Sequence, residues 1–246
     1  MFFRNLLVLL ITILGCYRGL IRAIRFHSEK ELAADHKRLE ELILLMSAVT
    51  PAVPFPLMRG FAITPDFGNI LAREIMYKKP RLVVELGSGV STLIAAYCLR
   101  RLGAGKVVSL EHDANYARSS RESVEAHGLQ DLVTVRHAPL VPVSLNGRSW
   151  TYYDPACFQD LSNIDLLIVD GPPARVQEMA RCPALPLFLE KLSPGAVILV
   201  DDAGRADESE MLRLWRERYP QLSIQRIATE KGTAVLSFDA DPCVAT

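Results

Sequence analysis

The sequence predicts an α/β protein with a Rossmann-like, doubly wound and mostly parallel seven-stranded sheet that ends in an antiparallel C-terminal hairpin. Three observations support this fold class. From Arg81 onward, short apolar strands alternate with helical patterns, which is typical of βαβ units. A glycine-rich turn separates the first of these strands from its helix. The last two strand patterns are joined by a short connection of a length that suits a hairpin.

The expected elements follow one another in a regular order. Strands are expected at residues 81–86, 106–110, 132–136, 165–169 and 196–200, and the terminal hairpin pairs 222–228 with 234–238. Helices are expected at 92–102, 114–127 and 208–218. Before the fourth strand, Asn146-Gly147 predicts an inserted hairpin. Its aromatic residues either pack it onto the sheet or form a wall of a ligand cleft; they are Trp150, Tyr152 and Tyr153.

Two helices are expected before the sheet. An amphipathic pattern runs from Ser28, as N-cap, to about Ser47, and a proline-rich stretch ends it. The second helix begins with Thr64 as N-cap and Pro65 at its first position. The chain therefore divides into an N-terminal segment (1–27), a helical extension with a proline-rich linker (28–60) and the α/β domain (61–246).

The N-terminal segment is uncharged from Asn5 to Tyr17 and then carries Arg18, Arg22 and Arg25. The uncharged stretch is shorter than the roughly 20 residues that a spanning helix needs. A signal peptide and a buried core helix are alternatives. We favour membrane association, with the segment inserted obliquely or lying in the interface and the α/β domain in the cytoplasm. A soluble cytoplasmic protein is the alternative localisation.

Composition excludes several classes of protein. The 246 residues contain 28 lysines and arginines against 28 acidic residues, so no nucleic-acid partner is expected. The five cysteines are odd in number and form no CxxC pair, which disfavours a disulfide framework or a zinc site. The oligomeric state has no readable signal in the sequence.

Acidic residues follow four of the expected strands, where ligands bind in an open parallel sheet. They are Glu85, Glu111, Asp170 and the pair Asp201-Asp202. The first lies beside the turn GSGVST. A dinucleotide fingerprint would place its third glycine where Thr92 stands, so a nicotinamide site is disfavoured.

Taken together, these segments resemble the class I S-adenosylmethionine-dependent methyltransferases. VVELGSGVS is similar to their first motif, and SLEHD is similar to the strand end whose acid holds the ribose hydroxyls. DLLIVDGPP and LSPGAVILVDDA resemble their fourth and fifth strands, so the likeness covers about 62–238 and makes 61–246 the methyltransferase domain. The resemblance implies S-adenosylmethionine as cofactor, with contacts from Glu85, Gly87, Ser88, Gly89, Ser91, Thr92, Glu111, His112 and Asp170.

AITPDFGNILAREI resembles the helix before the first motif in O-methyltransferases of the catechol and caffeoyl-coenzyme A type. That likeness implies a Mg²⁺ site formed by Asp170, Asp201 and Asp202. Two positions depart from the pattern: Asp202 replaces an amide and Pro173 replaces a lysine. Without a metal, Asp170 would lie beside the methionine moiety or act as general base. His137 and His112 are the other candidates for the base.

The resemblance thus implies an enzyme that transfers a methyl group from S-adenosylmethionine to a hydroxyl of a small or lipid-linked acceptor. The first alternative is a non-catalytic, membrane-tethered scaffold or cofactor-binding protein that retains the fold. A nicotinamide-dependent oxidoreductase is the second alternative, and the absence of a Tyr-x-x-x-Lys pair disfavours it. Arg175 and Arg205 follow two strand ends. They either bind an anionic acceptor or are solvated or salt-bridged.

Overall fold

The computed structural model describes residues 2–58, 60 and 62–238, and it leaves the side chains of residues 2–24 and 28 undescribed. The chain forms two compact units, Met1–Ile43 and Leu44–Thr246, and each is treated by itself below.

Helix α1 (Phe2–Val49) is continuous, so the predicted helix start at Ser28 is wrong. An N-cap needs a break in the helix before it, and no proline occurs in the chain before Pro51 to make one. Side chains one turn apart add support, with His27 Nε2 3.1 Å from Glu31 Oε1. The helix ends where Thr50 has a φ of 43° and Pro51 follows.

Within the described residues, the apolar stretches of the helices are all too short to cross a membrane. Association of residues 1–27 with a membrane surface stays a prediction.

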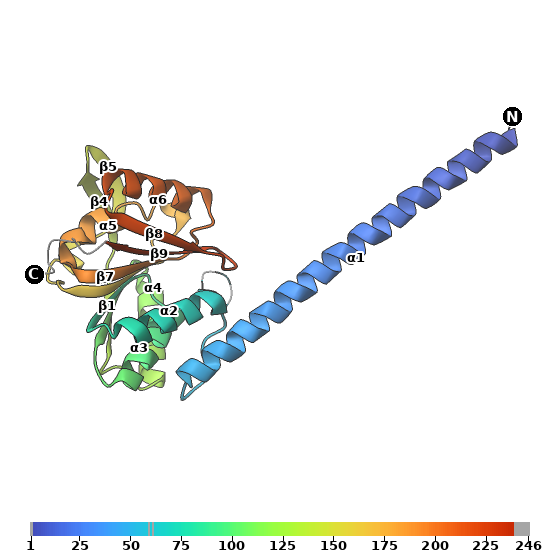
Figure 1. The fold of residues 1–246 in the computed structure, drawn as a ribbon. Coiled ribbons are helices and arrows are strands. Elements are labelled where there is room, and N and C mark those ends of the chain that lie inside the picture. The colour runs from blue at the N-terminus through green and yellow to red at the C-terminus, as the bar shows by residue number, and fades with distance from the viewer. Residues whose placement is uncertain (1, 59, 61, 239–246) are drawn as a thin grey trace, which may run out of the picture. The chain divides into compact units, whose positions relative to one another are not determined.

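The second unit contains the predicted sheet, in the order β3-β2-β1-β6-β7-β9-β8 (Figure 1). Strand β9 is antiparallel to β7 and β8, and the other neighbours are parallel. The strands are β1 (Leu82–Leu86), β2 (Lys106–Glu111), β3 (Val133–His137), β6 (Ile164–Val169), β7 (Leu192–Val200), β8 (Leu222–Ile227) and β9 (Thr233–Phe238). The predicted fold class is confirmed.

Successive strand residues point to opposite faces of the sheet, so each face has its own core. Val83 belongs to one core and Val84 to the other. The first core is covered by α2 (Pro65–Lys78), α3 (Val90–Leu102) and α4 (Ala114–Ala126). The second is covered by α5 (Ala184–Phe188) and α6 (Ala206–Arg218). Short 3₁₀ turns occupy Pro155–Cys157, Ala174–Val176 and Leu189–Lys191.

The inserted hairpin pairs β4 (Leu140–Leu145) with β5 (Arg148–Tyr153) in a separate two-stranded sheet. Asn146 and Gly147 both have positive φ, 55° and 75°, as a tight hairpin turn requires. Tyr152 and Tyr153 are fully buried in the second core. These aromatic side chains therefore pack the hairpin onto the main sheet, which is the first of the two predicted alternatives.

Candidate active site

The site begins where the winding of the sheet reverses, between β1 and β6. From β1 the chain continues to β2 and β3 on one side, whereas β6 leads to β7 on the other. Backbone hydrogen bonds extend the sheet past its strand ends. Asp170 N donates to Leu86 O at 3.1 Å, and Asp201 N donates to Val169 O at 3.2 Å. The acids after β6 and β7 are therefore held on adjacent strands.

The turn after β1 brings its backbone close to the carboxyl-terminal end of β6. Gly87 has a φ of 119°, a conformation that L side chains rarely adopt. A Cβ added there would lie 3.8 Å from Asp170 Cβ, so the turn and the end of β6 are neighbours. Any ligand that contacts the turn also comes near Asp170.

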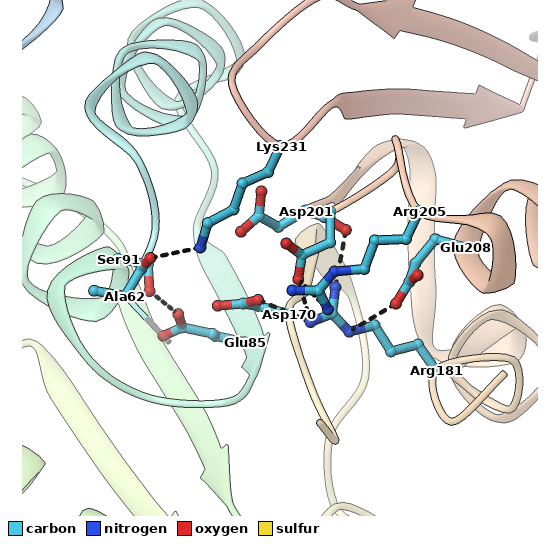
Figure 2. Close-up of polar contacts among 10 residues, drawn as sticks. Ala62, Glu85, Ser91, Asp170, Arg181, Asp201, Arg205, Glu208 and Lys231 are labelled. Atoms are coloured by element: carbon cyan, nitrogen blue, oxygen red, sulfur yellow. Dashed lines mark hydrogen bonds and ion pairs between the residues drawn. The ribbon is translucent and has the colours of Figure 1, made fainter. Parts of the chain in front are cut away.

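Glu85 ties the turn to the first residues of α3. Its buried carboxylate accepts a hydrogen bond from the hydroxyl of Ser91 (Figure 2). It accepts a second one from the hydroxyl of Thr92. Burial, only partly offset by these donors, raises the pKa of Glu85 to about 7. Thr92 Oγ1 also accepts a hydrogen bond from Gly89 N at 3.0 Å. Thr92 thus links the turn, the helix and Glu85 through one hydroxyl, a role that a glycine at this position has no side chain to perform.

Glu111 is the second carboxylate at the turn. Ser88 Oγ donates to its Oε2 at 3.1 Å, and Asp113 N donates to its Oε1 at 2.9 Å. His112 Nδ1 is 2.9 Å from Oε1. These contacts fix the orientation of the carboxylate. Oε1 is occupied by two nitrogen partners, whereas Oε2 has one partner and keeps a lone pair for a further donor.

His137 lies apart from the acids after β6 and β7. It is the last residue of β3, pairs in register with Glu111 and places Nε2 3.2 Å from His112 O. Three strand spacings separate β3 from β6, which is about 14 Å across the sheet. The structure therefore does not bring the two predicted catalytic residues, Asp170 and His137, together.

Asp170, Asp201 and Asp202 do come together, and one carboxylate oxygen from each lies within 4.8 Å of the others. We call these three residues the acidic cluster. Burial, followed by the charge of Asp202, raises the pKa of Asp201 to about 6. Burial also raises the pKa of Asp170 well above its usual range, against the opposing charge of Arg181.

Arg181, which was not among the predicted site residues, lies inside this cluster (Figure 2). Its guanidinium is 4% exposed, and its Nη2 lies 3.2 Å from Asp170 Oδ1 and 2.8 Å from Asp202 Oδ2. Nη1 donates to the carbonyl oxygen of Asp201 at 2.9 Å. Nε is 3.7 Å from Glu208 Oε1. The only sequence signal is an arginine directly before the apolar residues of α5, 11 positions after Asp170.

Two further cations lie near the acidic cluster. Arg205 Nη1 pairs with Asp202 Oδ2 at 2.9 Å, so this predicted anion-binding candidate is an ion-pair partner of Asp202. The charge of Lys231 opposes the rise in the pKa of Asp201. Lys231 Nζ also donates to Ala62 O at 2.8 Å, which ties the β8–β9 turn to the segment before α2 (Figure 2).

The acidic cluster does not fit the implied Mg²⁺ site in the arrangement described. Its oxygen ligands suit the ion, and neither oxygen of Asp201 has a hydrogen-bond partner among the described residues. However, Asp170 and Asp202 are already bound to the Arg181 guanidinium, and Asp202 also binds Arg205. Two of the three expected ligands are therefore engaged by arginine.

Residues 84–203 match the family model described as a methyltransferase domain. Among curated proteins, a ribosomal protein L11 methyltransferase from Alkaliphilus metalliredigens is 39% identical over 60 residues. That match takes in 24% of this chain and 18% of the other protein, so the aligned part is less than a fifth of that relative's length.

Solved structures of methyltransferases share the fold over most of the chain. An O-methyltransferase from Bacillus cereus in complex with SAH aligns with a TM-score of 0.57 and 20% identity, over 82% of this chain and 91% of the other. An SAH-bound methyltransferase from Podospora anserina aligns with a TM-score of 0.59 and 17% identity, over 81% and 88%. The family match and the shared fold agree: residues 84–203 carry a methyltransferase domain, and the chain has the fold of the solved methyltransferases.

Proposed function

We propose that this protein transfers a methyl group from S-adenosylmethionine to a hydroxyl of a small or lipid-linked acceptor. The observation that supports this most directly is the pair of oriented, buried carboxylates, Glu85 and Glu111, on either side of the Gly87–Gly89 turn. The alternative, a scaffold that retains the fold without catalysis, predicts cofactor binding at most and no turnover.

Each residue at the turn has a role that suits this cofactor. The Glu111 carboxylate, already oriented by Ser88 and Asp113 N, would accept hydrogen bonds from the two ribose hydroxyls. The Gly87–Gly89 backbone would allow close approach of the ligand. Glu85 would act by holding the turn through Ser91 and Thr92, because its carboxylate is fully buried.

Proton acceptance is assigned to Asp170. The bound cofactor would supply an already activated methyl group, so orientation of the acceptor hydroxyl can supply much of the rate. Asp170 lies at the reversal point beside Gly87, and burial raises its pKa, which makes its carboxylate a stronger proton acceptor than an exposed aspartate. His137 is less well placed, because it lies at the other side of the turn on β3.

Calorimetric titration of the full-length chain with S-adenosylmethionine tests the cofactor site. We expect Glu111→Gln to weaken binding about 10- to 100-fold, because the variant loses a charged acceptor for the ribose. Glu122→Gln is the matched control, since this glutamate is exposed on α4. Equal affinity in wild type and Glu111→Gln would contradict the assignment.

Turnover separates the enzyme from the scaffold. Transfer of labelled methyl groups to phenolic and catechol-like acceptors, and to lipid extracts, should give product with wild type. Asp170→Asn should reduce the rate while S-adenosylmethionine still binds. Cofactor binding without transfer to any acceptor of either class would favour the scaffold.

We also propose that residues 1–27 associate with anionic membranes. The support is the sequence itself, an uncharged stretch followed by Arg18, Arg22 and Arg25. Sedimentation with vesicles containing phosphatidylserine should bring down wild type, and replacement of the three arginines by glutamine should weaken this. No sedimentation at low salt would overturn the proposal.

A further inference from the structure

The acidic cluster contains a permanent cation of the protein's own. Arg181 contributes a guanidinium that cannot be deprotonated at accessible pH, and it is almost completely buried between Asp170, Asp202 and Glu208. Leaving these carboxylates buried without a cation would be costly, so a positive charge at this position stabilises the fold.

The charges at the cluster are nearly balanced without a metal ion. Four carboxylates lie there, those of Asp170, Asp201, Asp202 and Glu208. In the described part of the chain, three cations oppose them, namely Arg181, Arg205 and Lys231. With all four carboxylates ionised, the remainder is one negative charge, and a divalent ion would exceed it. The raised pKa values of Asp170 and Asp201 can only make this remainder smaller.

The remaining charge is best assigned to Asp201. Asp170 and Asp202 each place one oxygen on Arg181 Nη2, and Asp202 Oδ1 has no hydrogen-bond partner among the described residues. In Asp201 both oxygens are buried without such a partner. Only the main chain of Asp201 contacts the guanidinium, through its carbonyl oxygen. The arginine therefore holds two expected metal ligands and leaves one.

We propose that Arg181 takes the place of the divalent cation in this cluster, so that the enzyme holds Asp170 and Asp202 in position and works without a metal ion. Arg181 is a positioning residue in this proposal, because it acts through the carboxylates that it orients. The inference concerns cation binding and is tested separately from methyl transfer.

The first experiment titrates the full-length wild type with Mn²⁺ alone, with the free ion followed by electron paramagnetic resonance. No cofactor or acceptor is present, so the result does not depend on the proposed function. We expect a dissociation constant above about 1 mM, far weaker than a dedicated carboxylate site would give. Micromolar Mn²⁺ binding that Asp201→Asn abolishes would overturn the proposal.

The second experiment removes the arginine. Arg181→Met vacates the cation position while keeping an unbranched apolar chain, and we expect it to bind Mn²⁺ at least about 10-fold more tightly than wild type. Millimolar Mg²⁺ should also raise its melting temperature. Arg136→Met is the matched control, because Arg136 forms a two-point ion pair with Asp160 away from the cluster. Equal Mn²⁺ affinity in wild type and folded Arg181→Met would contradict the proposal.

A third measurement remains decisive if Arg181→Met does not fold. Once an acceptor is found, wild-type turnover in excess EDTA should equal turnover in Mg²⁺. Loss of turnover in EDTA and its recovery with Mg²⁺ would overturn the inference. If no acceptor is methylated but Mn²⁺ binding is weak in wild type, the proposed function fails while the inference about Arg181 stands.

Discussion

At the carboxyl-terminal ends of the parallel strands, the two halves of the sheet hold their carboxylates in different ways. After β1 and β2, Glu85 and Glu111 are held by side-chain hydroxyls and a backbone N–H. After β6 and β7, Asp170 and Asp202 are held by the guanidinium of Arg181. Neutral donors orient a carboxylate without cancelling its charge, whereas a guanidinium orients the carboxylate and also cancels its charge.

This difference suggests a division of labour. The first half leaves an oxygen of Glu111 open to a ligand with hydroxyl groups, so loss of this carboxylate should affect binding. In the second half, arginine balances most of the negative charge of the carboxylates. A substitution there should lower the stability of the fold before it affects ligand binding. Substitutions in each half can therefore break or confirm that contrast.

Removing the guanidinium should have the largest effect. Arg181→Met leaves buried acids unpaired and should lower the free energy of unfolding by about 3–5 kcal/mol, measured by urea denaturation. Adding Asp202→Asn should recover part of this loss, because the two side chains interact directly. Strictly additive losses in the double variant would show that the ion pair is not the cause.

The pH dependence of stability should reveal Glu85. Its pKa is about 7 in the folded protein against an ordinary 4.5, so between these values the folded state keeps a proton that the unfolded chain has lost. Stability therefore falls as pH rises from about 4.5 to 7, by about 3 kcal/mol for this group. Glu85→Gln should remove that part of the slope, and Glu122→Gln should not. A slope that is the same in all three proteins would contradict the prediction.

The smallest expected effect concerns Thr92. Thr92→Val keeps the shape of the side chain but removes the acceptor for Gly89 N and a donor to Glu85, which should cost about 1–2 kcal/mol. Thr134→Val, at an exposed position of β3, is the control. Thermal unfolding of the two variants checks this, and equal changes would show that the hydroxyl of Thr92 has no special role.

The fold and the first half of the edge could be predicted from the sequence because their signals are local. The apolar strands, the glycine turn and the acids at strand ends all lie within short stretches. Glu85 and Glu111 each directly close an apolar run, and the pairing of β1 with β2 brings the two runs together.

The second half depends on a contact that no local pattern encodes. Arg181 meets Asp202, 21 positions later, through segments that show neither a strand nor a helix periodicity before α5. The continuity of α1 was missed for another reason. Ser28 and Glu31 match a capping box, but such a pair marks the start of a helix only where the preceding residues are not helical.

Gly171 links the inserted hairpin to the main sheet. A Cβ at this position would lie 2.2 Å from the hydroxyl oxygen of Tyr153 and 3.2 Å from Leu86 O. The hairpin can therefore stay docked only while position 171 has no side chain or position 153 has a shorter one. Across related sequences these two positions should covary, although 18 residues separate them, with glycine at 171 wherever tyrosine occupies 153.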